Sequence, residues 1–174
     1  MMTYPQAYLQ YLVYFHGNRD YFECHEVLEE YWKEVDPANR SSHWVGLIQL
    51  AVGLYHYRRN NVQGAGRMLS KALRNLSAKN EELEKLGLES TALLHIIEKT
   101  LHDINGGLPY KSIDLPIKDT DLLKEAEELC RKEGFTWCMP SDLSNKELIH
   151  RHSMRDRTPV ITDRLNALKK KRLT

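Results

Sequence analysis

Apolar side chains recur every three or four residues along most of this chain, which is the spacing of one face of an α-helix. Helix-breaking residues interrupt the pattern at Gly17-Asn18, at Asp36-Pro37 and at Asn60-Asn61. No run of alternating apolar and polar residues indicates a strand, although 134–139 fits a short extended piece. The pattern therefore predicts helices near residues 3–16, 20–35, 42–59, 65–76 and 89–104.

Two of these predicted helices begin with residues that can cap a helix. Thr3 and Gln6 have the spacing of a capping box, with Pro5 in the first turn, and Asp20 and Glu23 repeat that spacing. In a capping box each of the two side chains hydrogen-bonds to a backbone N–H group that would otherwise have no partner. We expect both helices to start at these residues.

The pattern changes after Asn105-Gly106-Gly107, which is a strong helix stop. The stretch that follows, 108–120, contains two prolines and no sustained period. Beyond it come three shorter helical patterns, near residues 121–133, 145–155 and 159–171.

We therefore divide the chain into a helical bundle core (1–107), a Pro-containing connection (108–120) and a helical C-terminal appendage with a basic tail (121–174). The predicted fold class is all-α: a bundle of about five helices built from helical hairpins, with the appendage wrapped on it or tethered to it. We expect few contacts to cross the boundary, so that the core folds without the appendage.

Composition and charge limit the class of protein. The 174 residues suit one domain, and a net charge of +1 with a pI of about 7.8 lacks the strongly basic field of a dedicated nucleic-acid binder. The sequence has no apolar window of the roughly 18 residues that a membrane span needs. Cys24, Cys130 and Cys138 form no CxxC pair, which indicates reduced thiols. We therefore expect a cytoplasmic protein.

The second predicted helix carries the most informative polar residues. At about 100° per residue, Tyr21, Cys24 and Leu28 share an apolar face, while His25 falls at its border and Glu29 follows one turn later. A histidine and a carboxylate four residues apart can hydrogen-bond, fix a tautomer of the ring or share a metal ion.

The third predicted helix is apolar around nearly its whole circumference, which indicates a central, buried helix. Gln49 and His56, seven residues apart, interrupt that surface, and leaving a buried polar group without a partner costs about 1–3 kcal/mol. We expect them to converge with His25 and Glu29 in one polar cluster, with Trp32 as its wall. Two glycines, Gly46 and Gly53, lie on an adjacent stripe and indicate close helix packing or ligand access.

Part of the chain resembles a known family. The motif from Tyr21 to Trp32, with its His-Glu-x-Leu-Glu-x-x-Trp core, the run Gly46–Ala51, His56, and Asn61 with Gly64-Ala65 are similar to the bacterial and archaeal family catalogued as domain of unknown function 309. The resemblance covers roughly residues 8–76 and implies a compact all-helical fold with no established activity. Cys24 departs from the small residue often found at its position in that motif.

The favoured interpretation is a helical scaffold or protein-interaction protein, in which His25, Glu29, Gln49 and His56 form a satisfied polar network. Its partner would be another protein or a second copy of itself. The alternative is a small-molecule- or metal-binding protein, including a hydrolase-type enzyme, that uses His25, Glu29 and His56. No cofactor other than such a metal ion is expected. No motif supplies a nucleophile or a phosphate loop, which favours binding over catalysis.

Two lesser interpretations concern the C-terminal third. The basic tail could contact nucleic acid, but Asp156 and Asp163 interrupt it and few aromatic residues lie nearby to stack on bases. A zinc site would need the cysteines and histidines of this region, yet the spacing between the two cysteines is far from that of common zinc knuckles. The candidate ligands are Cys130, Cys138, His150 and His152.

Overall fold

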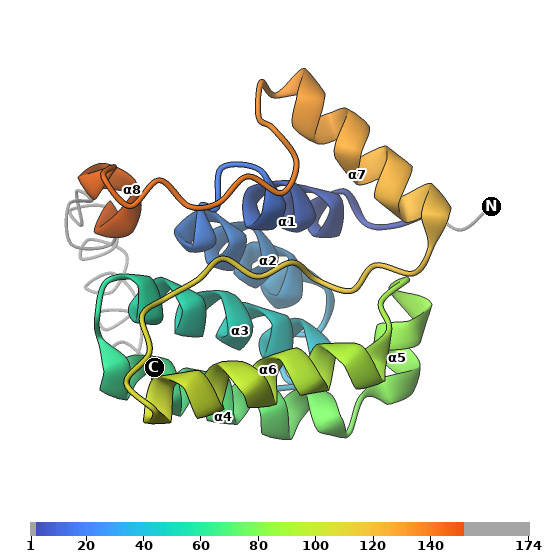
Figure 1. The fold of residues 1–174 in the computed structure, drawn as a ribbon. Coiled ribbons are helices and arrows are strands. Elements are labelled where there is room, and N and C mark those ends of the chain that lie inside the picture. Colours follow the sequence, from blue (N-terminus) through green and yellow to red (C-terminus); the bar gives the residue numbers. More distant parts are fainter. Residues whose placement is uncertain (1–2, 152–174) are drawn as a thin grey trace, which may run out of the picture.

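The computed structural model describes residues 3–151, and within them the helices form an all-α bundle (Figure 1). The first four helices are α1 (Gln6–His16), α2 (Tyr21–Val35), α3 (His43–Arg58) and α4 (Val62–Ser77). Short connections join them, so that successive helices reverse direction and form helical hairpins, as the sequence predicts.

Four further helices follow: α5 (Asn80–Lys85), α6 (Ser90–Asn105), α7 (Thr120–Lys132) and α8 (Lys146–Ile149). The pattern predicts α6, α7 and the start of α8. It does not predict α5, because six residues are too few to establish a helical period.

The described part of the chain contains no strand, and its one β feature is an antiparallel bridge between Leu88 and Ile117. The extended piece expected at 134–139 is a turn and irregular backbone instead. The predicted helix at 159–171 and the rest of the basic tail lie outside the described residues.

Only one of the two expected capping boxes has a capping side chain. Asp20 accepts a hydrogen bond from the backbone N–H of Glu23 (3.1 Å) and caps α2 as predicted. The box at Thr3 and Gln6 is wrong: Pro5 occupies the N-cap position of α1, and no side chain caps the helix. Thr3 therefore lies too early in the chain to meet the first free N–H groups.

Helix α3 lies at the centre of the bundle and packs against both α2 and α4. A Cβ atom added at Gly46 would lie 2.7 Å from Leu76 Cγ, and one added at Gly53 would lie 2.7 Å from Leu69 Cγ. Both leucines belong to α4. Close helix packing therefore explains why α3 contains two glycines, each of which costs about 1 kcal/mol in a helix interior.

The chain beyond Gly107 packs onto the bundle. Figure 1 shows residues 108–119, the strap, running back across the bundle to α7, which packs against α1. Leu115, Leu122 and Ala126 are buried in the same hydrophobic core as the first four helices. Many contacts thus cross the boundary at Gly107, and the division of the chain there stays a prediction.

Candidate functional site: a charged groove over α3

One stripe of α3 is partly open to solvent although the rest of the helix is buried. Between Trp44 and Tyr57 the half-buried residues are Val45, Gln49, Val52 and His56, and every other residue is buried. Spacings of four, three and four residues place them on one face of the helix. We call them the α3 stripe. The central helix is therefore closed on all sides but one, and both predicted polar residues lie on the open side.

Helix α2 forms one wall beside this stripe. His25 Nε2 lies 2.6 Å from Glu29 Oε2, and Glu29 Oε1 lies 2.6 Å from Lys33 Nζ. The side chains of His25 and Glu29 are 25% and 31% exposed, so the pair is at the surface rather than in the core. The hydrogen bond from His25, assisted by Lys33, lowers the pKa of Glu29 to about 2. The carboxylate is therefore ionised throughout the neutral range.

Helix α4 forms the opposite wall, and a hollow of about 730 Å³ lies beside it, with Trp32 as the lining residue from α2. Within it, Asn75 Nδ2 donates to Gln49 Oε1 (3.3 Å), while Trp32 donates its indole N–H to the carbonyl of Asn39 (3.1 Å). The cations that line the hollow are Arg40, Lys71, Arg74 and Lys79. A hydrogen-bonded amide pair and an indole edge thus form the floor, and cations form the rim.

Charge is segregated between the two walls. The chain between Asp36 and Glu81 contains no aspartate or glutamate. Its cations are Arg40, Arg58, Arg59, Arg67, Lys71, Arg74 and Lys79. Helix α2 has the opposite character, with one lysine among carboxylates at Glu23, Glu26, Glu29, Glu30 and Glu34. The two helices that flank α3 therefore differ in sign, with α2 acidic and α4 basic, although the whole chain is nearly neutral.

The residues predicted to form one buried cluster are half-buried, and the structure gives them different neighbours. His25 contacts Glu29 as expected. Gln49 hydrogen-bonds to Asn75 of α4, and the ring of His56 lies 3.3 Å from the amide of Asn61. The convergence of all four residues in one cluster, with Trp32 as its wall, stays a prediction. Trp32 lines the same hollow as Gln49.

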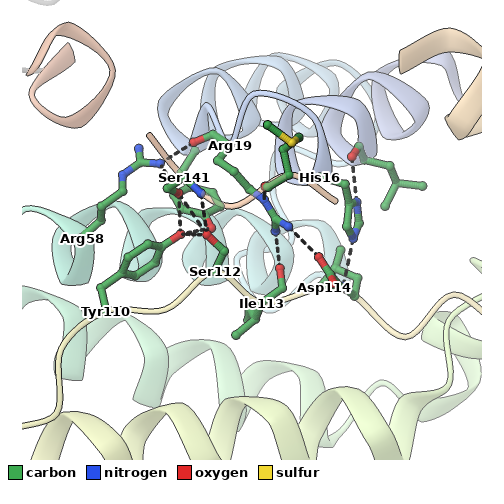
Figure 2. Close-up of polar contacts among 12 residues, drawn as sticks. His16, Arg19, Arg58, Tyr110, Ser112, Ile113, Asp114 and Ser141 are labelled. Carbon is green, nitrogen blue, oxygen red and sulfur yellow. Dashed lines mark hydrogen bonds and ion pairs between the residues drawn. The ribbon is translucent and has the colours of Figure 1, made fainter. Parts of the chain in front are cut away.

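A second polar network holds the far end of the molecule together (Figure 2). Arg19, only 2% exposed and with a φ of 57°, donates to the carbonyls of Met139 (2.7 Å) and Ile113 (2.5 Å). Its remaining nitrogen contacts Asp114 (2.7 Å). One side chain from the turn between α1 and α2 thus binds two distant segments, the strap and residues 138–141.

Hydroxyl groups extend this network. The hydroxyl of Tyr110 lies 2.5 Å from that of Tyr21 and 2.8 Å from that of Ser141 (Figure 2 shows the contact with Ser141). Arg58, 4% exposed, donates to the carbonyl of Arg19 (2.6 Å) and lies over the ring of Tyr21. Most of these donors and acceptors partner one another, although the Nε of Arg58 is buried without a hydrogen-bond partner. We therefore assign this network, which we call the Arg19 network, the structural role of fastening the C-terminal segments to the bundle.

Within residues 3–151 no group of three His, Cys, Asp or Glu side chains is placed to hold a metal ion. His152, one of the zinc ligands considered above, lies outside this range. The cysteines Cys24, Cys130 and Cys138 are free thiols. Of the helices that the structure describes, none is long and apolar enough to span a membrane.

Together these features define an all-helical protein with a bipolar groove over its central helix. The family model described as "Domain of unknown function (DUF309)" matches residues 8–68, which include α2, α3 and the start of α4. A relative from Bacillus subtilis (strain 168), named "Uncharacterized protein YpuF", is 49% identical over 169 residues, or 97% of each chain. The chain therefore belongs to the DUF309 family. No solved structure gives a significant match.

The cations of α4 are functional candidates that the apolar pattern did not indicate. Arg67, Lys71 and Arg74 lie at helical spacing on α4, which carries no acidic residue. Net charge evaluated helix by helix, instead of over the whole chain, would have found them. The burial of His16 and Arg19 was also missed, since nothing in the local sequence indicates that polar residues at the end of α1 and in the turn after it are buried.

Proposed function

We propose that this protein works as a protein-interaction protein, and that it binds a partner chain across the face formed by α2, α3 and α4. The observation that carries this proposal is the α3 stripe, the one open side of a buried central helix, set between walls of opposite charge. Apolar surface from Val45, Val52 and Trp32 lies between the charged edges. An apolar centre with a charged, hydrated rim is the usual composition of a protein interface.

The dimensions of the groove favour a protein chain over a small molecule. The stripe from Val45 to His56 spans roughly 16 Å of helix at 1.5 Å per residue. A small-molecule site is usually a concave pocket that encloses its ligand, whereas the α3 stripe is partly exposed along most of a helix. A helix or an extended segment of another protein can lie along its whole length. We also propose a cytoplasmic location, which the three free thiols among the described residues support.

Site-specific photo-cross-linking in cells that produce this protein tests the proposal. A photoreactive amino acid replaces Gln49 in the floor of the groove, and a matched control replaces Glu98, an exposed residue of α6. We expect a discrete cross-linked protein species from position 49 and none from position 98. Reversing Lys71 and Arg74 to Glu should abolish that species, because α4 would then repel an acidic partner edge. Equal cross-linking at both positions, or none at position 49, would contradict the proposal.

A further inference from the structure

The outer face of α2 carries a straight row of carboxylates. Glu26, Glu30 and Glu34 follow one another at intervals of four residues, so their side chains stand on one face of the helix. Glu30 and Glu34 are exposed, and Glu26 is half-buried beside His25. The first and last of the three are about 12 Å apart along the helix axis.

The outer face of α4 carries a matching row of cations. Arg67, Lys71 and Arg74 are exposed and lie at intervals of four and three residues, over about 10 Å of the helix. The lengths of the two rows therefore differ by only about 1.5 Å, which is the rise of one helical residue. When the two helices lie parallel, Glu26 faces Arg67, Glu30 faces Lys71 and Glu34 faces Arg74.

The order of the helices supplies the symmetry that such pairing requires. α2 and α4 pack on α3, and because each connection reverses the chain, they run in the same direction on either side of it (Figure 1). A two-fold axis that lies parallel to α3, in front of the α3 stripe, exchanges the two sides of the second copy and keeps the direction of its helices. It sets α2 of one copy parallel to α4 of the other, and it does so twice.

We propose that the partner bound by this face is a second copy of the same chain, in an isologous dimer. This inference rests on the proposed function and specifies its partner. A uniformly acidic partner would meet the carboxylates of α2, and a uniformly basic one would meet the cations of α4. A second copy carries both signs in the required order. The apolar surface at Trp32, Val45 and Val52 would pack against the same surface of the other copy.

Charge reversal and mixing test this dimer. The full-length chain, measured by light scattering during size-exclusion chromatography over a concentration series, should have the mass of a dimer and dissociate as salt is raised. Glu30→Lys and Lys71→Glu should each raise the dissociation constant roughly tenfold or more, because like charges then face each other at two symmetric places. Both positions are exposed, so circular dichroism should show the wild-type helical content in both variants. Glu98→Lys on α6 is the matched control and should stay dimeric.

Mixing the two reversed variants gives the sharper result. In a heterodimer the new lysine at position 30 faces the new glutamate at position 71, while Lys71 of the first variant faces Glu30 of the second. The equimolar mixture should therefore recover the dimer mass that each variant loses alone. A monomeric wild-type chain, or a mixture that stays monomeric, overturns the proposal. If the wild-type chain is monomeric while position 49 still cross-links to a different protein, self-association is wrong and the proposed function stands.

Discussion

At the scale of single residues, the glycines of α3 and α4 make a matched set. Gly53→Ala would place a Cβ atom 2.7 Å from Leu69 Cγ, whereas a Cβ atom at Gly66 of α4 would meet nothing within 4 Å. We expect Gly53→Ala to lower the free energy of unfolding by about 1–3 kcal/mol through overpacking. Gly66→Ala should raise it by about 1 kcal/mol through helix propensity alone. Urea unfolding measures both, and a stabilised Gly53→Ala variant would mean that α3 and α4 are not this close.

His16 makes a second prediction at this scale, on pH. Its ring Nδ1 bonds to the carbonyl of Leu12 (2.8 Å) and Nε2 accepts from the N–H of Leu115 (2.9 Å), so the ring is held neutral. Burial lowers its pKa to about 4, against about 6.5 in the unfolded chain. Its contribution is therefore complete above pH 6.5 and is lost as the pH falls from 6.5 towards 4.

The size of this effect follows from the difference between the two pKa values. By pH 4 the loss should be on the order of 3 kcal/mol. Free energies of unfolding measured against pH for the wild-type chain and for His16→Gln, which does not titrate, isolate this contribution from that of the carboxylates. Parallel curves for the two proteins between pH 4 and 6.5 would show that His16 is not held neutral.

At the scale of elements, the Arg19 network decides how firmly the strap is held. Arg19→Met would leave the carbonyls of Ile113 and Met139 without their donor in a buried place, at a cost on the order of 3 kcal/mol. Asp114→Asn is the matched control, because Asp114 is 54% exposed and a surface ion pair contributes less than about 1 kcal/mol. Amide hydrogen exchange should rise at residues 111–114 and 138–141 in Arg19→Met alone. Unchanged exchange there would mean that other contacts hold the strap.

The helices themselves were largely predictable from the sequence because their signals are local. Apolar periodicity and helix stops located α1 to α4 and α6, and Asp20 caps α2 as its spacing with Glu23 implies. The apolar pattern failed at two places, the start of α1 and the short helix α5. Pro5 took the N-cap position in place of Thr3, and α5 is shorter than two turns.

The candidate site was less predictable because its character depends on neighbouring helices. The apolar pattern of α3 correctly marked Gln49 and His56 as polar exceptions. It also predicted that both side chains are buried, whereas they are half-buried. Their exposure depends on the width of the gap between α2 and α4, and no local pattern encodes that width. Gln49 found its partner in Asn75, twenty-six positions later in the chain.

At the scale of the whole molecule, we now expect one cooperative unit. Leu122 of α7 is fully buried in the shared core, and Leu122→Ala should cost about 2–5 kcal/mol. That cost should appear as a lower midpoint of a single transition, the same by circular dichroism and by tryptophan fluorescence. Lys124→Ala, at an exposed position of α7, is the control. If the main transition of Leu122→Ala is unchanged, residues 1–107 fold independently, as the sequence pattern suggested.

The three tryptophans lie in three different surroundings, so each can serve as an intrinsic fluorescence probe of a different part of the chain. Trp44 is 8% exposed in the core, Trp32 lines the groove, and Trp137 stacks on the His16 ring with 4.4 Å between centroids. Indole emission responds to the polarity of its surroundings. Chains that retain one tryptophan at a time would therefore report separately on occupation of the groove, collapse of the core and release of the segment around Trp137 from His16.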